Sequence, residues 1–135
     1  MIFDTSVWID FSKGKVTSKS ELLRDRLYNN FNVSICPSIL QEVLQGCSST
    51  SQFIKLRERL LALELLESNE YMISIKAAQM YFQLRKKGIT IRKPNDCIIA
   101  IYALEFDIQL VHNDKDFDEI AKIFPLKIYN PITNE

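Results

Sequence analysis

Glycine, proline and histidine are scarce in this chain of 135 residues, which has 3 glycines, 4 prolines and one histidine. With so little glycine and proline and no internal repeat, the sequence offers no linker long enough to separate domains. Cysteine is also scarce, and no CxxC spacing occurs among Cys36, Cys47 and Cys97. Because these cysteines are odd in number and lie in apolar stretches, we expect reduced core residues.

An excess of charge of one sign is missing too, because 17 Lys and Arg residues balance 17 Asp and Glu residues. Summed charge therefore attracts neither a polyanion nor a polycation, and a nucleic acid would have to be bound locally. No apolar run approaches the ~18 residues of a membrane span, and the first residues lack the basic segment of a signal peptide. We expect a cytoplasmic protein without a membrane partner.

Apolar residues make up 47% of the chain and charged residues 25%, which is typical of a single globular domain. We therefore expect one domain over residues 1–135. Apolar segments alternate with segments of helical spacing, which indicates an α/β fold with a parallel sheet. The expected strands cover residues 1–4, 33–36, 63–66, 108–111 and 126–129. The expected helices cover residues 5–11, 20–31, 37–46, 52–66, 68–87, 97–106 and 114–123, and the helical pattern over 52–66 ends in the short strand expected at 63–66. Residues 13–19 are expected to form a loop.

Acidic residues stand where the expected strands end and where the expected helices begin. Asp4 closes the first strand, Asp114 follows the strand that ends at residue 111, and Asp96 precedes the most apolar helix. Glu42 lies at the margin of the apolar stripe of the third helix. Ligands of parallel sheets gather at the carboxyl ends of the strands, so we expect these carboxylates to lie near one another.

Carboxylates held close together repel, and a like-charged pair at ~4 Å costs ~4 kcal/mol at an effective dielectric constant near ~20. Divalent cations such as Mg²⁺ or Mn²⁺ would offset this repulsion, since they prefer oxygen ligands and bind carboxylates together with phosphate oxygens. Such a site activates water and stabilises the charge that develops on a phosphoryl group. The acids therefore predict phosphodiester hydrolysis.

Each acid taken alone also fits a purely structural role. Asp4 and Asp96 could interact with helix N-termini, and Glu42 could be a solvated helix residue. Asp114 and Asp116 could form a polar turn and a first helical turn. The residues alone leave these alternatives open.

Three segments together resemble one known family: DTSVWIDF at the amino terminus, PSILQEVLQG in the first third, and RKPNDCIIAIYALEFDIQLVHNDKDFDEIA near the end. With the total length, they resemble a PIN-domain ribonuclease of the VapC type, the toxin of a toxin–antitoxin pair. The resemblance covers nearly the whole chain in order. It implies a three-layer α/β/α fold with a central parallel sheet of four to five strands.

The resemblance also implies a function and a set of site residues. The implied catalytic acids are Asp4, Glu42, Asp96 and Asp114. The implied metal ligands are Asp4, Asp96, Asp114 and Asp116, with Asp114 and Asp116 as alternatives for the fourth acid. Thr5 or Ser6 would orient a carboxylate or a metal-bound water. Relatives hydrolyse RNA with Mg²⁺ or Mn²⁺, form homodimers and are held inactive by a cognate antitoxin protein, so we expect the same partners here.

Three further residues near the acids have open roles. His112 stands where many relatives carry Ser or Thr, and we interpret it as a structural histidine at a strand end. Arg92 and Lys93 precede Asp96 closely in sequence, so they could contact the phosphates of a nucleic acid. The main alternative function is a non-catalytic PIN-like module that binds RNA or protein. A flavodoxin-like receiver would share the strand–helix alternation but would carry paired acids after its first strand.

Overall fold

A four-stranded parallel sheet forms the centre of the computed structural model, which describes residues 1–131. Its strands are β1 (Ile2–Phe3), β2 (Ser34–Ile35), β3 (Glu64–Leu65) and β4 (Leu110–Val111), in the order β3-β2-β1-β4. Each neighbouring pair is parallel. The helices described are α1 (Thr5–Ser12), α2 (Ser18–Tyr28), α3 (Pro37–Gln45), α4 (Thr50–Leu61), α5 (Glu70–Lys86), α6 (Asn95–Glu105) and α7 (Lys115–Ala121).

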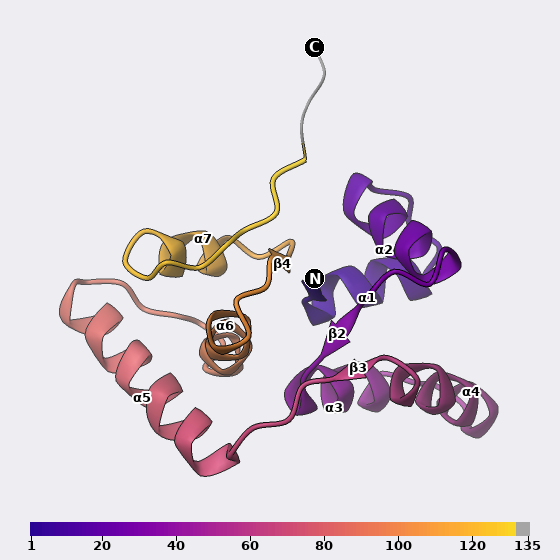
Figure 1. The fold of residues 1–135 in the computed structure, drawn as a ribbon, viewed down its shortest axis with the longest axis horizontal. Coiled ribbons are helices and arrows are strands. Elements are labelled where there is room, and N and C mark those ends of the chain that lie inside the picture. The colour runs from indigo at the N-terminus through magenta and orange to yellow at the C-terminus, as the bar shows by residue number, and fades with distance from the viewer. Residues whose placement is uncertain (132–135) are drawn as a thin grey trace.

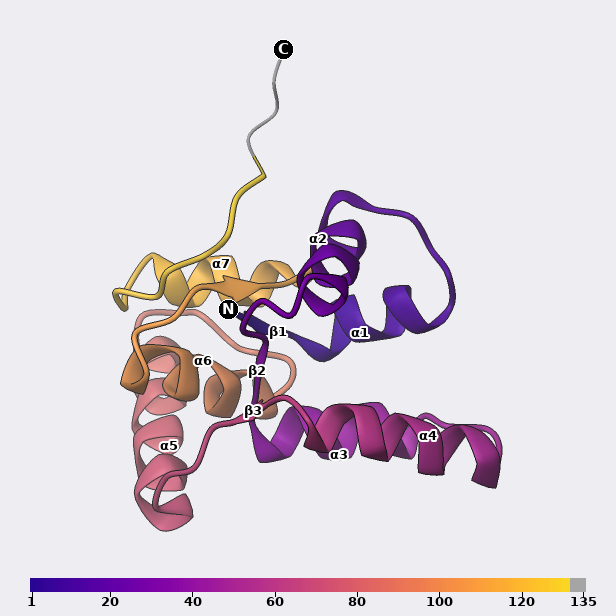
Figure 2. The ribbon, with the colours of Figure 1, turned by 45° about the vertical axis from the view of Figure 1, so that its right-hand side comes forward.

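Helices cover both faces of this sheet. Figures 1 and 2 show α1 and α2 on one side of the strands and α5 and α6 on the other. The predicted three-layer α/β/α fold with a parallel sheet of four to five strands is thereby confirmed. None of the helices described for residues 1–131 is long and apolar enough to cross a membrane. The last four residues of the expected domain, 132–135, lie outside the described residues.

The strands β1 and β4 are apolar at both positions because they are buried, whereas the edge strand β3 is exposed. Ile2 and Phe3 of β1 and both residues of β4 are fully buried, because helices pack on each face of the sheet. The helix α6 is buried on most sides, as its apolar sequence predicts, and it packs between α3, α5 and α7. The core therefore holds β1, β4 and α6 in place; Asp96 lies in α6, and Asp4 and Asp114 lie just after β1 and β4.

Several expected boundaries differ in the structure, and two of the differences have a clear local cause. The loop over residues 13–19 is shorter than expected, because Thr17 forms a capping box with Ser20 and α2 begins at Ser18. The prediction of a fifth strand over residues 126–129 is wrong, because this segment forms one isolated bridge, between Leu110 and Ile128. A tight turn precedes the bridge, where the Leu126 amide donates to the carbonyl of Phe124 at 2.8 Å, so the ladder starts late.

Candidate active site

The sheet order places the ends of β1 and β4 side by side. The chain runs from β1 outward to β2 and β3, and then returns to the other side of β1 to form β4. Phe3 pairs with Val111, and the Asp4 amide donates to the Val111 carbonyl at 2.9 Å. Ligands of open α/β sheets bind at such a change of direction, outside the carboxyl ends of the strands. The sheet therefore brings Asp4 next to the turn that contains Asp114.

Asp4 is a buried carboxylate that caps α1. Its Oδ2 accepts hydrogen bonds from the Ser6 amide at 3.2 Å and from the Ser6 hydroxyl at 2.7 Å. The same hydroxyl accepts a hydrogen bond from the Asn113 amide at 3.2 Å. Ser6 thus joins Asp4 to the turn after β4, whereas the buried Thr5 hydroxyl makes no hydrogen bond within the described residues.

Asp96 lies in the first turn of α6, and only 4% of its surface is exposed. Its Oδ2 is buried and makes no hydrogen bond with any described residue. Burial, together with the negative charges of Asp4 and Asp114, raises the pKa of Asp96 to about 7. A buried carboxylate with an unsatisfied oxygen and acidic neighbours is costly unless a cation neutralises it.

Asp114 and Asp116 lie close to Asp96. One carboxylate oxygen of each of these three residues lies within 4.8 Å of the others. Asp114 caps α7 by accepting from the Asp116 amide at 3.0 Å, and Asp116 is buried at the start of the same helix. The sequence left Asp114 and Asp116 as alternatives for one position, and the structure brings both to Asp96.

Glu42 stands apart from this three-carboxylate cluster. It lies on α3, it is half-buried, and its Oε1 makes no hydrogen bond within residues 1–131. Burial raises the pKa of Glu42, the charge of Asp4 raises it further, and Lys93 acts in the opposite direction. The charge of Asp4 thus acts on both Glu42 and Asp96, so Asp4 lies near Glu42 as well as near the cluster.

Arg92 and Lys93 pair with acids of the cluster. The Arg92 guanidinium lies 3.4 Å from Asp116 and 3.3 Å from Asp114, and its amide donates to Asp116 at 3.1 Å. The Lys93 ammonium lies 4.0 Å from Asp114. The Arg92 side chain is still 64% exposed, so it reaches the carboxylates from the solvent side. A guanidinium in this position partly neutralises the acids.

We expect Arg92→Ala to strengthen the binding of a divalent cation to the cluster by up to about fivefold, because an exposed ion pair contributes little and the guanidinium competes for the same oxygens. Titration of the variant with Mn²⁺ would measure this change. The matched control is Arg24→Ala, since Arg24 is also an exposed arginine that pairs with an acid, Glu21. Weaker cation binding by Arg92→Ala would show that the guanidinium supports the site.

Several residues of the site were not found by sequence reasoning. Asn113 donates to Ser6 with its amide and to Asp10 with its side chain at 3.1 Å, and Lys19 donates to the carbonyl of His112. These contacts join residues that are 107, 103 and 93 positions apart. No local pattern in a single sequence could have indicated them.

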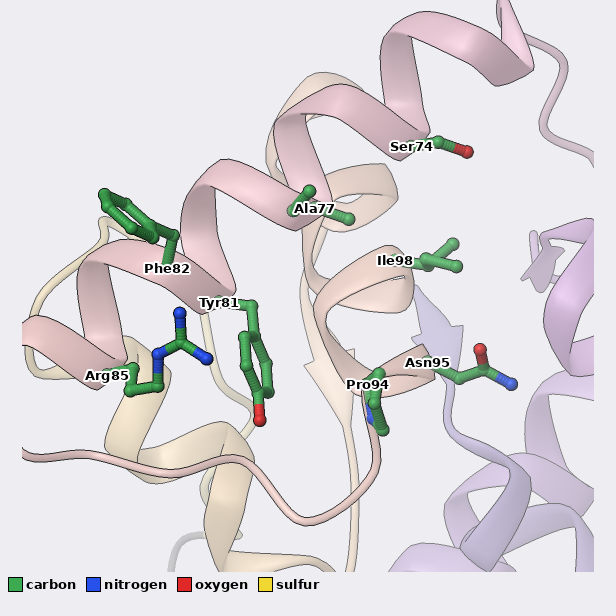
Figure 3. A pocket seen from close by; sticks show the side chains of 9 residues that line it. Ser74, Ala77, Tyr81, Phe82, Arg85, Pro94, Asn95 and Ile98 are labelled. Atoms are coloured by element: carbon green, nitrogen blue, oxygen red, sulfur yellow. The ribbon is translucent and has the colours of Figure 1, made fainter.

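Two hollows adjoin the site. One of about 440 Å³ lies between α5 and α6, where Tyr81 and Arg85 face Pro94 and Asn95 (Figure 3). None of the described acids of the site lines it. The other, of about 270 Å³, lies between α1, α3 and α4 and is lined in part by Glu42. Glu42 therefore lines the second hollow, whereas Asn95, the neighbour of Asp96 in the chain, lines the first.

The family model of the PIN domain matches residues 1–123. The VapC ribonuclease Mb1587 of Mycobacterium bovis is 29% identical over 128 residues, which cover 94% of this chain and 96% of that protein.

Two solved structures share the fold. VapBC2 from Rickettsia felis, bound to a DNA fragment from its promoter, matches with a TM-score of 0.72 at 23% identity, over 97% of this chain and 99% of the other. VapBC-1 from nontypeable Haemophilus influenzae matches with a TM-score of 0.71 at 24% identity, over 96% of this chain and 98% of the other. The family resemblance seen in the sequence is therefore confirmed, and the chain belongs to the PIN-domain family.

Proposed function

We propose that this protein is a metal-dependent endoribonuclease, the toxin of a toxin–antitoxin pair, which hydrolyses phosphodiester bonds of RNA. The observation that carries the proposal is the cluster of Asp96, Asp114 and Asp116, whose oxygens lie within 4.8 Å of one another. The similarity to proteins named VapC ribonuclease supports the choice of substrate and reaction.

The residues present fit a divalent cation. The cluster offers carboxylate oxygens, which Mg²⁺ and Mn²⁺ prefer, and the buried Oδ2 of Asp96 has no hydrogen-bond partner among the described residues. Asp96, Asp114 and Asp116 would hold the cation, with Asp4 and Glu42 on the adjoining side. A bound Mg²⁺ or Mn²⁺ would supply a more acidic water and neutralise the charge that develops at phosphorus.

The protein's own residues would orient this chemistry. Ser6 holds the Asp4 carboxylate by two hydrogen bonds, so Asp4 could position the attacking water or a cation without rearranging. Arg92 and Lys93 reach the cluster from solvent, and they could exchange their contacts with the carboxylates for contacts with RNA phosphates. In-line attack of water would then leave a 3′-hydroxyl and a 5′-phosphate.

We extend the proposal to the partners. The similar solved structures are VapBC assemblies, and one of them is bound to DNA. By analogy, we propose that a cognate antitoxin binds this chain and holds it inactive in the cytoplasm, and that the active form is a homodimer.

Cleavage of RNA by the purified, antitoxin-free protein tests the proposal. With a single-stranded RNA, we expect products in the presence of Mn²⁺ or Mg²⁺ and none in the presence of excess chelator, because the proposed reaction needs the cation to make the water more acidic and to neutralise charge at phosphorus. Gel electrophoresis with end-labelled RNA would reveal both the products and their termini. Cleavage that persists in chelator would contradict metal dependence, and RNA binding without cleavage in any metal would favour the non-catalytic module.

A further inference from the structure

His112 follows β4 directly, and its ring is buried, with 4% of the residue exposed. Both ring nitrogens have partners. Nδ1 accepts a hydrogen bond from the Asp114 amide at 3.0 Å, and Nε2 lies 3.1 Å from Oδ1 of Asp118. The ring also packs against Phe117, with centroids 5.1 Å apart. The imidazole thus bridges the turn before α7 and the first turn of that helix.

These partners determine which nitrogen carries the proton. A backbone amide can only donate, so Nδ1 must be unprotonated to accept from Asp114. The proton of the neutral ring is therefore on Nε2, where it is donated to the Asp118 carboxylate. Lys19 of α2 donates to the backbone carbonyl of His112 and so anchors the backbone that carries the ring.

The bond from Nδ1 to the amide two residues later has a specific consequence for the carboxylates. It closes a side-chain turn of the kind that Ser, Thr, Asn and Asp commonly form with the same amide. Within this turn Asp114 caps α7, and its carboxylate oxygen accepts from the Asp116 amide. The direction in which both carboxylates face Asp96 thus depends on the backbone that His112 holds.

We propose that His112 is a positioning residue for the carboxylate cluster: its Nδ1 fixes the Asp114 amide, and thereby orients Asp114 and Asp116 toward a shared divalent cation. The consequence for cation binding rests on the proposed function. The hydrogen bond between the Asp114 amide and Nδ1 of His112 does not depend on that function. It assigns to the ring a role beyond that of the structural histidine expected from the sequence. Residues that orient metal ligands in this way typically contribute about 10-fold to 100-fold to metal affinity.

Substitutions of His112 can separate the effects of its two hydrogen bonds, at Nδ1 and at Nε2. In His112→Asn, the side-chain oxygen takes the place of Nδ1 and can accept from the Asp114 amide, while the contact with Asp118 is lost. His112→Gln extends its amide toward Asp118 and leaves the Asp114 amide without this acceptor. His112→Leu keeps the bulk of an apolar side chain and provides neither partner. Glu119→Gln is the control, since Glu119 lies on the same helix and pairs with Lys122.

Amide hydrogen exchange in chelator and Mn²⁺ titration test the proposal on the full chain. We expect His112→Asn to stay within about threefold of the wild type in both measurements. For His112→Gln and His112→Leu, we expect exchange of the Asp114 amide to be at least about tenfold faster and Mn²⁺ binding about 10-fold to 100-fold weaker. The proposal is overturned if His112→Leu matches the wild type, or if His112→Asn is as impaired as His112→Leu.

Two measurements on the wild type, ¹⁵N NMR of the His112 ring and RNA cleavage, separate a failure of the positioning role from a failure of the proposed function. ¹⁵N NMR of the wild-type ring reports the tautomer without any substitution, and a proton on Nδ1 at neutral pH would overturn the proposal even if a variant fails to fold. If the wild type neither binds Mn²⁺ nor cleaves RNA while the exchange pattern is as expected, the proposed function fails and the positioning of Asp114 stands. If RNA is cleaved but the exchange pattern fails, the positioning role is refuted alone.

Discussion

Asp96→Asn is expected to reduce RNA cleavage by about 10³-fold or more and, in the same preparation, to stabilise the metal-free protein. The loss of activity follows because the neutral amide oxygen of asparagine binds a divalent cation more weakly than a carboxylate does. The gain in stability follows because Asp96 is buried beside other acids, with a pKa of about 7. Asparagine keeps the size of the side chain and removes the charge that burial penalises.

The opposite signs of these two effects make the result diagnostic. A residue that only supported the fold would lose activity and stability together. Urea denaturation in chelator and a cleavage assay in Mn²⁺ measure the two effects. Glu105→Gln is the control, because Glu105 ends the same helix and pairs with Lys76 at the surface, so we expect little change in either measurement. Cleavage at the wild-type rate by Asp96→Asn would refute the assignment.

The second large effect is a dependence of stability on pH that bound metal opposes. The folded state raises the pKa of Asp96 from 3.8 to about 7, so between these values the folded protein binds more protons than the unfolded chain. Stability from this group is therefore fully present below about pH 4 and is lost as the pH rises toward 7. The loss is about 4 kcal/mol, since the pKa rises by about 3 and a change of 1 in pKa corresponds to about 1.4 kcal/mol.

Divalent cations act in the opposite direction, because they bind the ionised carboxylates. At a concentration about 100 times its dissociation constant, a cation that binds only the folded state adds about 2.7 kcal/mol to its stability. We expect this gain to be large near pH 8 and small near pH 5, where protons compete for Asp96. The measurement is the free energy of unfolding in chelator and in Mn²⁺ across this range.

The contribution of Asp96 is obtained as the difference between the wild type and Asp96→Asn. This subtraction is needed because burial lowers the pKa of His112, so the stability contributed by that group rises with pH as the histidine loses its proton. In chelator, we expect the wild type to become less stable relative to the variant as the pH increases. A difference that is independent of pH would contradict the raised pKa, and equal stabilisation of both proteins by Mn²⁺ would place the cation elsewhere.

Local sequence signals were sufficient where short-range chemistry decides the structure. Asp4 and Asp114 cap helices because an aspartate before a helical stretch accepts from the amides that the first turn leaves free. The apolar residues after Asp96 form a buried helix because they have no polar face to expose. The expected fifth strand failed for a similar reason, since a turn that precedes residue 127 limits the pairing to one bridge.

The sequence by itself determined the α/β architecture and the presence of acids at the ends of buried strands. Which of these acids share a cation site was decided only by the tertiary structure. Asp96 and Asp114 are brought together because β4 pairs with β1 and α6 packs beside α7, and both depend on contacts between distant parts of the chain.

The same reason explains the partners of Arg92 and His112. The pairing of Arg92 with Asp116 and the proton on Nε2 of His112 follow from neighbours that folding supplies. Residue types and spacing therefore predicted the chemistry of this site, because ligand preference is a property of single side chains. The grouping of the ligands and their orientation required the fold, because both are relations between elements that meet only after the sheet has formed.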